Sequence, residues 1–132
     1  MKKALIMITM VATLAGCCTK KPHYENVDAY PVKQGSLAEM MYSPEQTTFS
    51  VWSPNADTVY LNLYANATTV APLQTLPMCR QKDGSWVKTV KGDLNGQFYT
   101  FKVVEHSSRW TLHETPGIFA KAVGVNGRRG AV

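Results

Sequence analysis

The chain has 132 residues, with 14 lysines and arginines against nine aspartates and glutamates, and its formal net charge is +5. This length accommodates one domain at most. The basic residues are scattered rather than arranged in a stripe that alternates with aromatic residues, which argues against a protein that binds nucleic acid.

The first 16 residues have the features of a signal peptide. The stretch MKKALIMITMVATLAGCC begins with two lysines after the initiator, continues with an apolar run and ends in small residues followed by cysteine. The apolar run is far shorter than the roughly 20 residues of a membrane-spanning helix. The final LAGC resembles a bacterial lipobox, which implies cleavage before Cys17 and attachment of lipid to its sulfur. An ordinary secretory signal that happens to precede a cysteine is the alternative.

Residues 17–42 are predicted to form a flexible, lipid-anchored linker. They contain prolines, a glycine and several charges but no sustained hydrophobic period, and one short turn is expected at residues 37–41. A tether of this length would hold a lipid-anchored domain away from the membrane. Cys18 and Cys79 are expected to remain thiols, with a disulfide between them as the alternative.

Residues 43–119 are predicted to form an all-β, antiparallel, immunoglobulin-like β-sandwich. Polar turns separate runs in which apolar and polar residues alternate, at intervals of roughly eight to twelve residues, a pattern typical of this architecture. The predicted strands are 47–53, 58–65, 76–81, 85–90, 97–105 and 109–112. The apolar side chains that share one face of their strand are Phe49 and Val51, then Val59, Leu61 and Leu63, then Tyr99, Phe101 and Val103.

The sequence contains no motif of known catalytic or cofactor chemistry. A phosphate-binding loop, a dinucleotide-binding glycine pattern and a nucleophile elbow are all missing. The three histidines lie far apart along the chain, and no cysteine and histidine spacing suits zinc. The aspartates fall mainly in turns, where they serve the backbone. We therefore predict no catalytic residue, no metal and no cofactor for this chain.

The three tryptophans are the remaining candidates for binding. Trp52 and Trp86 lie inside predicted strands and are expected to pack in the core or between the sheets. Trp110 follows a polar stretch on a short strand, so we expect its ring to be partly exposed. Exposed aromatic rings stack on the flat C–H faces of sugars, which makes Trp110 a candidate for carbohydrate contact.

Three stretches together resemble one protein family. They are YSPEQTTFSVWSPNADTVYLNLY (42–64), GSWVKTVKGDLNGQFYTFKV (84–103) and AKAVGVNGRRGAV (120–132). They are similar to the N-terminal module of type I pullulanases, a β-sandwich of carbohydrate-binding module family 48 that precedes the barrel of glycoside hydrolase family 13. The resemblance implies that residues 120–132 are the passage toward a catalytic barrel of about 250 residues, before which this chain stops. Hydrolysis of α-1,6 linkages would belong to that barrel, so this chain alone is predicted to be inactive.

The resemblance carries over only part of the family's sugar site. Trp110 and Asn126 match its second tryptophan and its asparagine, whereas the first tryptophan would fall near residues 65–69 and the lysine near Thr100. This implies weak binding of α-glucans such as starch, pullulan or glycogen, together with packing against the barrel through apolar surface at residues 119–127. A free-standing starch- or glycogen-binding lipoprotein and a module without ligand are the alternatives. The expected location is the bacterial envelope, on its periplasmic face rather than the cell surface.

Overall fold

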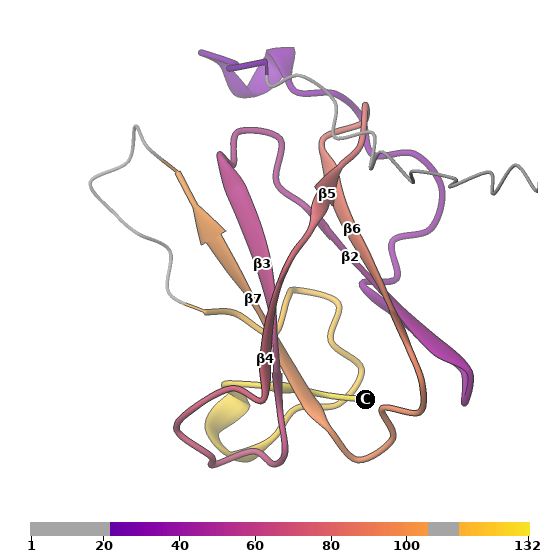
Figure 1. Ribbon diagram of the computed structural model, residues 1–132. Coiled ribbons are helices and arrows are strands. Elements are labelled where there is room, and N and C mark those ends of the chain that lie inside the picture. The colour runs from indigo at the N-terminus through magenta and orange to yellow at the C-terminus, as the bar shows by residue number, and fades with distance from the viewer. Residues whose placement is uncertain (1–21, 106–113) are drawn as a thin grey trace, which may run out of the picture.

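The computed structural model describes residues 22–105 and 114–132, which form two four-stranded antiparallel sheets that face each other (Figure 1). One sheet has the strand order β1-β2-β6-β5, and the other has the order β4-β3-β7-β8. The strands are β1 Met40–Tyr42, β2 Gln46–Trp52, β3 Thr58–Tyr64, β4 Gln74–Pro77, β5 Cys79–Arg80, β6 Ser85–Lys91, β7 Phe98–Val104 and β8 Gly130–Ala131. Two 3-10 helices, η1 Val27–Ala29 and η2 Val125–Gly127, flank them. The prediction of an all-β antiparallel sandwich is confirmed.

Several sequence predictions concern residues outside these ranges. The signal peptide, Cys17 and Cys18, Trp110 and the strand predicted at 109–112 all lie outside the described residues. Between residues 22 and 105, and again from 114 onward, no helix is both long and apolar enough to span a membrane.

The core lies between the two sheets and is built from the alternating positions that the sequence predicts. The inward side chains of the three long runs are all buried: Phe49, Val51, Val59, Leu61, Leu63, Tyr99, Phe101 and Val103. The ring of Tyr99 lies 5.0 Å from that of Phe49 and 5.5 Å from that of Phe101, measured between centroids. Burial, with a smaller contribution from the charge of Glu39, raises the pKa of the Tyr99 hydroxyl to about 12. The phenol therefore stays neutral at any pH in which the protein would work.

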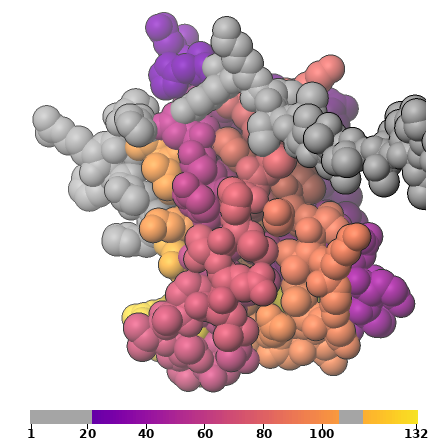
Figure 2. All heavy atoms as spheres, viewed as in Figure 1, coloured from indigo at the N-terminus to yellow at the C-terminus, as the bar shows by residue number. Residues whose placement is uncertain are grey.

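The predicted strand at 76–81 is divided between the two sheets. β4 pairs with β3, whereas β5 pairs with β6 in the opposite sheet, and the buried Met78 stands between them. Pro77 has no N–H to offer a ladder, but the Met78 N–H still donates to the Val59 carbonyl of β3 at 2.9 Å, and pairing with β6 begins at Cys79. From β4 to β6 the chain forms one continuous outer surface, coloured rose to orange in Figure 2. A short apolar run does not reveal such a crossing, because both halves keep the same alternation.

Residues 22–42 differ from the predicted linker because they contact the sandwich. The backbone N–H of Tyr24 donates to the Asn55 side chain at 3.0 Å, and the Asn55 amide donates back to the Tyr24 carbonyl at 2.9 Å. Further along, the backbone N–H of Gln34 donates to the Asp83 carboxylate at 2.9 Å. The segment then ends in β1, which pairs with β2. A lack of hydrophobic period indicates irregular structure, and it does not indicate detachment from the domain.

The predictions for Trp52 and Trp86 have different outcomes. Trp86 is buried in the core as expected, but Trp52 is 39% exposed, so its predicted packing in the core or between the sheets is wrong. Trp52 follows the inward-facing Val51, and alternation therefore directs it to the outer face. There its indole N–H donates to the Asp83 carbonyl at 2.9 Å, and its ring meets the edge of Tyr30 at a centroid distance of 5.9 Å.

The segment expected to lead toward a barrel, residues 120–132, folds back and completes a sheet. Ala131 and Gly130 of β8 pair with Phe98 and Tyr99 of β7. The backbone N–H of Ala131 also donates to the Ala122 carbonyl at 2.9 Å, so residues 122–131 form a hairpin with η2 at its tip. This hairpin therefore contributes to the described sandwich.

Candidate functional site

The candidate site lies on the outer face of the β4-β3-β7-β8 sheet, where three segments meet. A hollow of about 200 Å³ is lined by Ala67, Thr68, Val125, Asn126, Arg128 and Arg129. A second hollow of about 560 Å³ is lined by Thr100, Glu114, Arg128 and Arg129. The two hollows share both arginines, and we call them together the arginine site. The segment at 65–69, Thr100 and Asn126, which the family resemblance marks as separate parts of a sugar site, therefore meet at one place.

Arg129 holds the arginine site together. Its guanidinium carbon lies 3.5 Å from the centroid of the Tyr64 ring, a cation–π contact. The same guanidinium donates to the backbone carbonyl of Asn66 at 2.9 Å and to that of Thr69. The Asn66 side chain in turn accepts the N–H groups of Thr68 and Thr69, which fixes the loop. Arg129 thus joins the C-terminal hairpin to the loop after β3.

Glu114 supplies the negative charge of the arginine site. The Thr100 hydroxyl donates to the carboxylate of Glu114 at 2.8 Å, and the Tyr64 hydroxyl donates to the same oxygen atom. Burial and the hydrogen bond to Glu114 raise the pKa of Tyr64, whereas the nearby Arg129 lowers it. Tyr64 and Thr100 are thus held by hydrogen bonds, and Arg128 and Glu114 are the exposed charged residues of the site.

Asn126 has a backbone role in addition to its place in the smaller hollow. It lies exposed in η2 with φ 61°, in the left-handed region that asparagine tolerates better than most residues. The next residue, Gly127, also has a positive φ of 64°. This turn geometry is sufficient to account for the NG pair, so contact between Asn126 and a sugar remains a prediction. Sequence reasoning missed Arg128, Arg129 and Glu114, although the paired arginines in the GRRG stretch were a visible signal.

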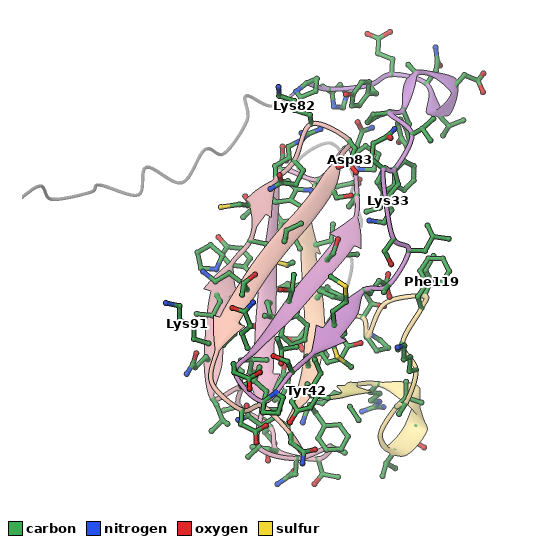
Figure 3. All side chains as sticks on the ribbon, turned by 90° about the vertical axis from the view of Figure 1, so that its right-hand side faces the viewer. Lys33, Tyr42, Lys82, Asp83, Lys91 and Phe119 are labelled. Atoms are coloured by element: carbon green, nitrogen blue, oxygen red, sulfur yellow. The ribbon has the colours of Figure 1, made fainter. Side chains whose placement is uncertain are left out.

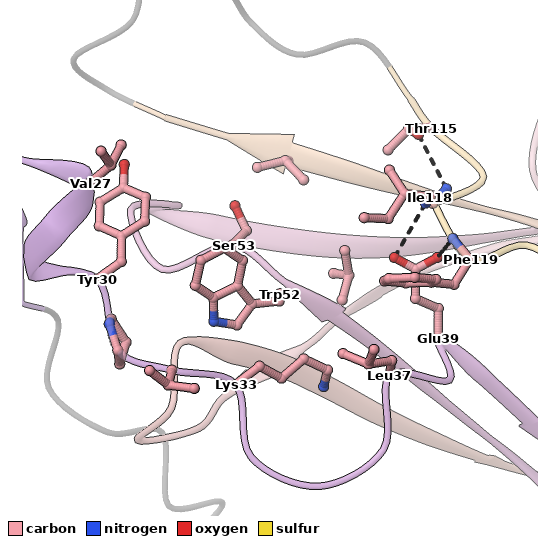
Figure 4. Close-up of a pocket in the computed structure, with 15 residues that line it drawn as sticks. Val27, Tyr30, Lys33, Leu37, Glu39, Trp52, Ser53, Thr115, Ile118 and Phe119 are labelled. Atoms are coloured by element: carbon pink, nitrogen blue, oxygen red, sulfur yellow. Dashed lines mark hydrogen bonds between the residues drawn. The ribbon is translucent and has the colours of Figure 1, made fainter.

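A second concave surface, which we call the apolar groove, lies on a different side of the molecule. It has a volume of about 610 Å³ and runs between the N-terminal segment, the end of β2 and the turn 115–119 (Figure 4). Its lining is mostly apolar: Val27, Tyr30, Pro31, Val32, Leu37, Val51, Trp52, Val103, Ile118 and Phe119, with Lys33, Glu39, Ser53, Thr115 and Gly117. Figure 3 shows Lys33 beside Asp83, with Phe119 further along the same edge of the sandwich.

The apolar exposure predicted for residues 119–127 is present. Phe119 is 46% exposed, Val123 is 51% exposed and Val125 is 64% exposed. The preceding Ile118, which the sequence analysis did not single out, is 86% exposed. Among the residues that the structure describes, no three histidine, cysteine, aspartate or glutamate side chains gather closely enough to hold a metal ion.

Comparison with known proteins relates this sandwich to a family of carbohydrate-binding modules. Residues 36–116 match the family model for carbohydrate-binding module 48, the isoamylase N-terminal domain. The pullulanase of Bacillus subtilis strain 168 is 37% identical over 93 residues, which are 70% of this chain and 12% of that protein.

Solved pullulanases have the same fold over most of this chain. The Paenibacillus barengoltzii enzyme, in complex with maltohexaose and α-cyclodextrin, superposes with a TM-score of 0.72 and 37% identity over 80% of this chain and 16% of its own. The type I pullulanase of B. subtilis in complex with maltose gives a TM-score of 0.67 and 32% identity over 83% of this chain and 14% of its own. The chain thus spans a small fraction of these relatives. On the match to its family model, supported by these structures, the chain belongs to the carbohydrate-binding module 48 family.

Proposed function

We propose that this chain is the N-terminal, non-catalytic module of a pullulanase-type debranching glycoside hydrolase. Its roles are to pack against the catalytic barrel and to bind α-glucan weakly, while the barrel hydrolyses α-1,6 linkages. The observation that carries the proposal is the match of the module to pullulanases in both sequence and fold. Their complexes with maltooligosaccharides support an α-glucan as the ligand class for this chain as well.

The arginine site supports weak rather than tight glucan binding. The exposed Arg128 and Asn126 offer polar contacts to sugar hydroxyls, but the described lining of the two hollows contains no aromatic ring. Trp110 is the one candidate for stacking, and a stacked ring contributes roughly 1–3 kcal/mol by analogy with nucleic-acid bases. A dissociation constant of 1 mM corresponds to about 4 kcal/mol. One ring and a few hydrogen bonds therefore suggest millimolar affinity or weaker.

Calorimetric titration of the full chain with maltoheptaose tests this part of the proposal. We expect a dissociation constant in the millimolar range or above. Trp110→Ala should abolish binding, and Arg128→Ala should weaken it about fivefold, an effect of about 1 kcal/mol. Lys91→Ala, an exposed change on the other sheet, should leave it unchanged. Micromolar affinity would favour a free-standing glucan-binding lipoprotein. Unaltered binding by the Trp110→Ala protein would show that the ring is wrongly assigned.

We further propose that Cys17 carries the lipid that anchors the module to the bacterial envelope, on its periplasmic face. The support for this is the LAGC stretch at the end of the apolar run. Cys17→Ala should abolish incorporation of labelled palmitate and leave an unprocessed or released protein. Cys18→Ala is the matched control and should keep the label. Equal labelling of the Cys17→Ala protein would contradict the anchor.

A further inference from the structure

We propose that the apolar groove is the surface on which the catalytic domain of a pullulanase-type enzyme docks, and that Glu39 positions the turn that forms its anchor. This inference rests on the proposed function and specifies which face of the module makes that contact. It assigns the contact to Ile118 and Phe119 on the turn and to Leu37 on the facing N-terminal segment, on a side of the sandwich away from the arginine site.

The turn at the edge of the groove presents apolar side chains to solvent. Ile118 is 86% exposed, and the facing Leu37 is 56% exposed. Both line the same cavity together with Phe119 and Trp52. Contiguous exposed apolar surface of this kind marks an interaction site. A side chain as exposed as Ile118 contributes little to the stability of the sandwich itself.

The turn is nevertheless held firmly by a buried carboxylate. Glu39 is only 5% exposed, and its carboxylate accepts the backbone N–H groups of Phe119 at 2.8 Å and Ile118 at 3.4 Å (Figure 4). Behind the turn, Thr115 exchanges two backbone hydrogen bonds with Phe101 of β7, at 2.7 and 2.9 Å. Burying a carboxylate is costly unless its hydrogen bonds are made. The geometry thus fixes an exposed apolar pair before any partner arrives, which lowers the entropy cost of binding.

Gly117 makes this arrangement possible. Its φ is +90°, and a Cβ atom at this position would collide with the Glu39 carboxylate. A larger residue would therefore displace either the turn or the carboxylate. Together, the backbone of the turn, Gly117 and Glu39 fix the positions of Ile118 and Phe119.

The chemistry of the groove favours a protein surface over a sugar. Two thirds of its lining residues are apolar or aromatic, and most of these are aliphatic. Aliphatic side chains, unlike exposed aromatic rings, offer a glucan neither stacking nor partners for its hydroxyl groups. The relatives also extend far beyond the matched region, since this chain covers 12% of one pullulanase and 16% of another. The turn 115–119 immediately precedes the hairpin 122–131, which pairs with β7. In the resemblance to pullulanases, the chain leads from this hairpin toward the barrel, and the barrel is the occupant that we assign to the groove.

A chimaeric enzyme tests the inference. In the B. subtilis pullulanase, the region matched by this chain is replaced with residues 22–132, and its thermal inactivation is compared with that of the enzyme lacking the region. The chimaera should be inactivated at a higher temperature. Ile118→Ser and Phe119→Ser should each remove at least half of that gain. Val70 is 93% exposed and does not line the groove, so Val70→Ser should leave the gain in inactivation temperature intact. The melting temperature of the full chain alone should be unaffected by Ile118→Ser.

The outcomes separate the two proposals. If the chimaera is no more stable than the enzyme without the region, the proposed packing function fails. If the chimaera is stabilised but Ile118→Ser and Phe119→Ser leave its inactivation temperature unchanged, the proposed packing function stands. The assignment of the contact to the apolar groove is then wrong. Glu39→Gln should lower the inactivation temperature of the chimaera more than the melting temperature of the full chain, and equal shifts would reduce Glu39 to a structural role. Self-association of the full chain that Ile118→Ser abolishes would assign the groove to a second copy and overturn the inference.

Discussion

Replacing Phe101 with alanine is expected to lower the free energy of unfolding by about 3–5 kcal/mol. Phe101 is fully buried on β7, and its ring contacts Tyr99, which in turn contacts Phe49 of the opposite sheet. The substitution leaves a cavity where the two sheets meet, and the flanking strands are hydrogen-bonded in a ladder that cannot close over it. Small domains have a total stability of about 5–15 kcal/mol, so the substitution would remove a substantial part of the stability of the fold.

Urea denaturation of the full chain, followed by tryptophan fluorescence, measures this effect. Lys102→Ala is the matched control, because Lys102 is the next residue on the same strand and points to solvent. It should change the unfolding free energy by less than about 0.5 kcal/mol. A loss below about 1.5 kcal/mol for Phe101→Ala would mean that the sheets collapse over the cavity, contrary to the packing described.

The second large effect is expected for Gly130→Ala, at about 3 kcal/mol. A Cβ atom on Gly130 would lie less than 3.0 Å from Cζ, Cε1 and the hydroxyl oxygen of Tyr99. Tyr99 is 1% exposed and cannot move aside. The substitution should therefore detach β8 from β7 and loosen the hairpin that carries Arg129.

Gly96→Ala provides a comparison of the opposite kind. Gly96 has a φ of +80° but open space around its Cβ position, so only backbone strain of about 1–2 kcal/mol is expected there. Thermal denaturation of both variants, with amide hydrogen exchange of residues 130 and 131, distinguishes the two causes. We expect the amides of residues 130 and 131 to lose protection from hydrogen exchange in the Gly130→Ala protein and to keep it in the Gly96→Ala protein. Equal stability of the two variants would contradict close packing between Gly130 and Tyr99.

The sheet could be predicted from sequence because its signal is local. In β3 and β7 the apolar positions recur every second residue, and Val59, Leu61 and Phe101 are all buried as that period requires. The same rule directed Trp52 outward, and the prediction of packing for Trp52 failed because it weighed residue type above alternation. The crossing at Met78 left no trace in the pattern, since a change of sheet preserves the alternation.

The sites were harder to predict because they depend on contacts between distant parts of the chain. Arg129 meets Tyr64, and Glu39 meets Phe119 across 80 positions. Sequence spacing carries no information about such pairs. The family resemblance did mark Asn126 and Thr100, which come together at the arginine site. The apolar groove had one visible signal, the exposed apolar residues around Phe119, but its other wall was assigned to a linker.

The lengths of the outer strands limit how this domain can meet other proteins. Among the residues that the structure describes, the strands at the sheet edges are β1 with three residues, β5 and β8 with two each, and β4 with four, ending in Pro77. A strand from another molecule would find too few free backbone groups for a stable added ladder. The edges at β1, β4 and β5 therefore resist strand exchange and the early steps of amyloid growth. A partner that meets the domain at one of these three strands has to recognise side chains rather than add a strand.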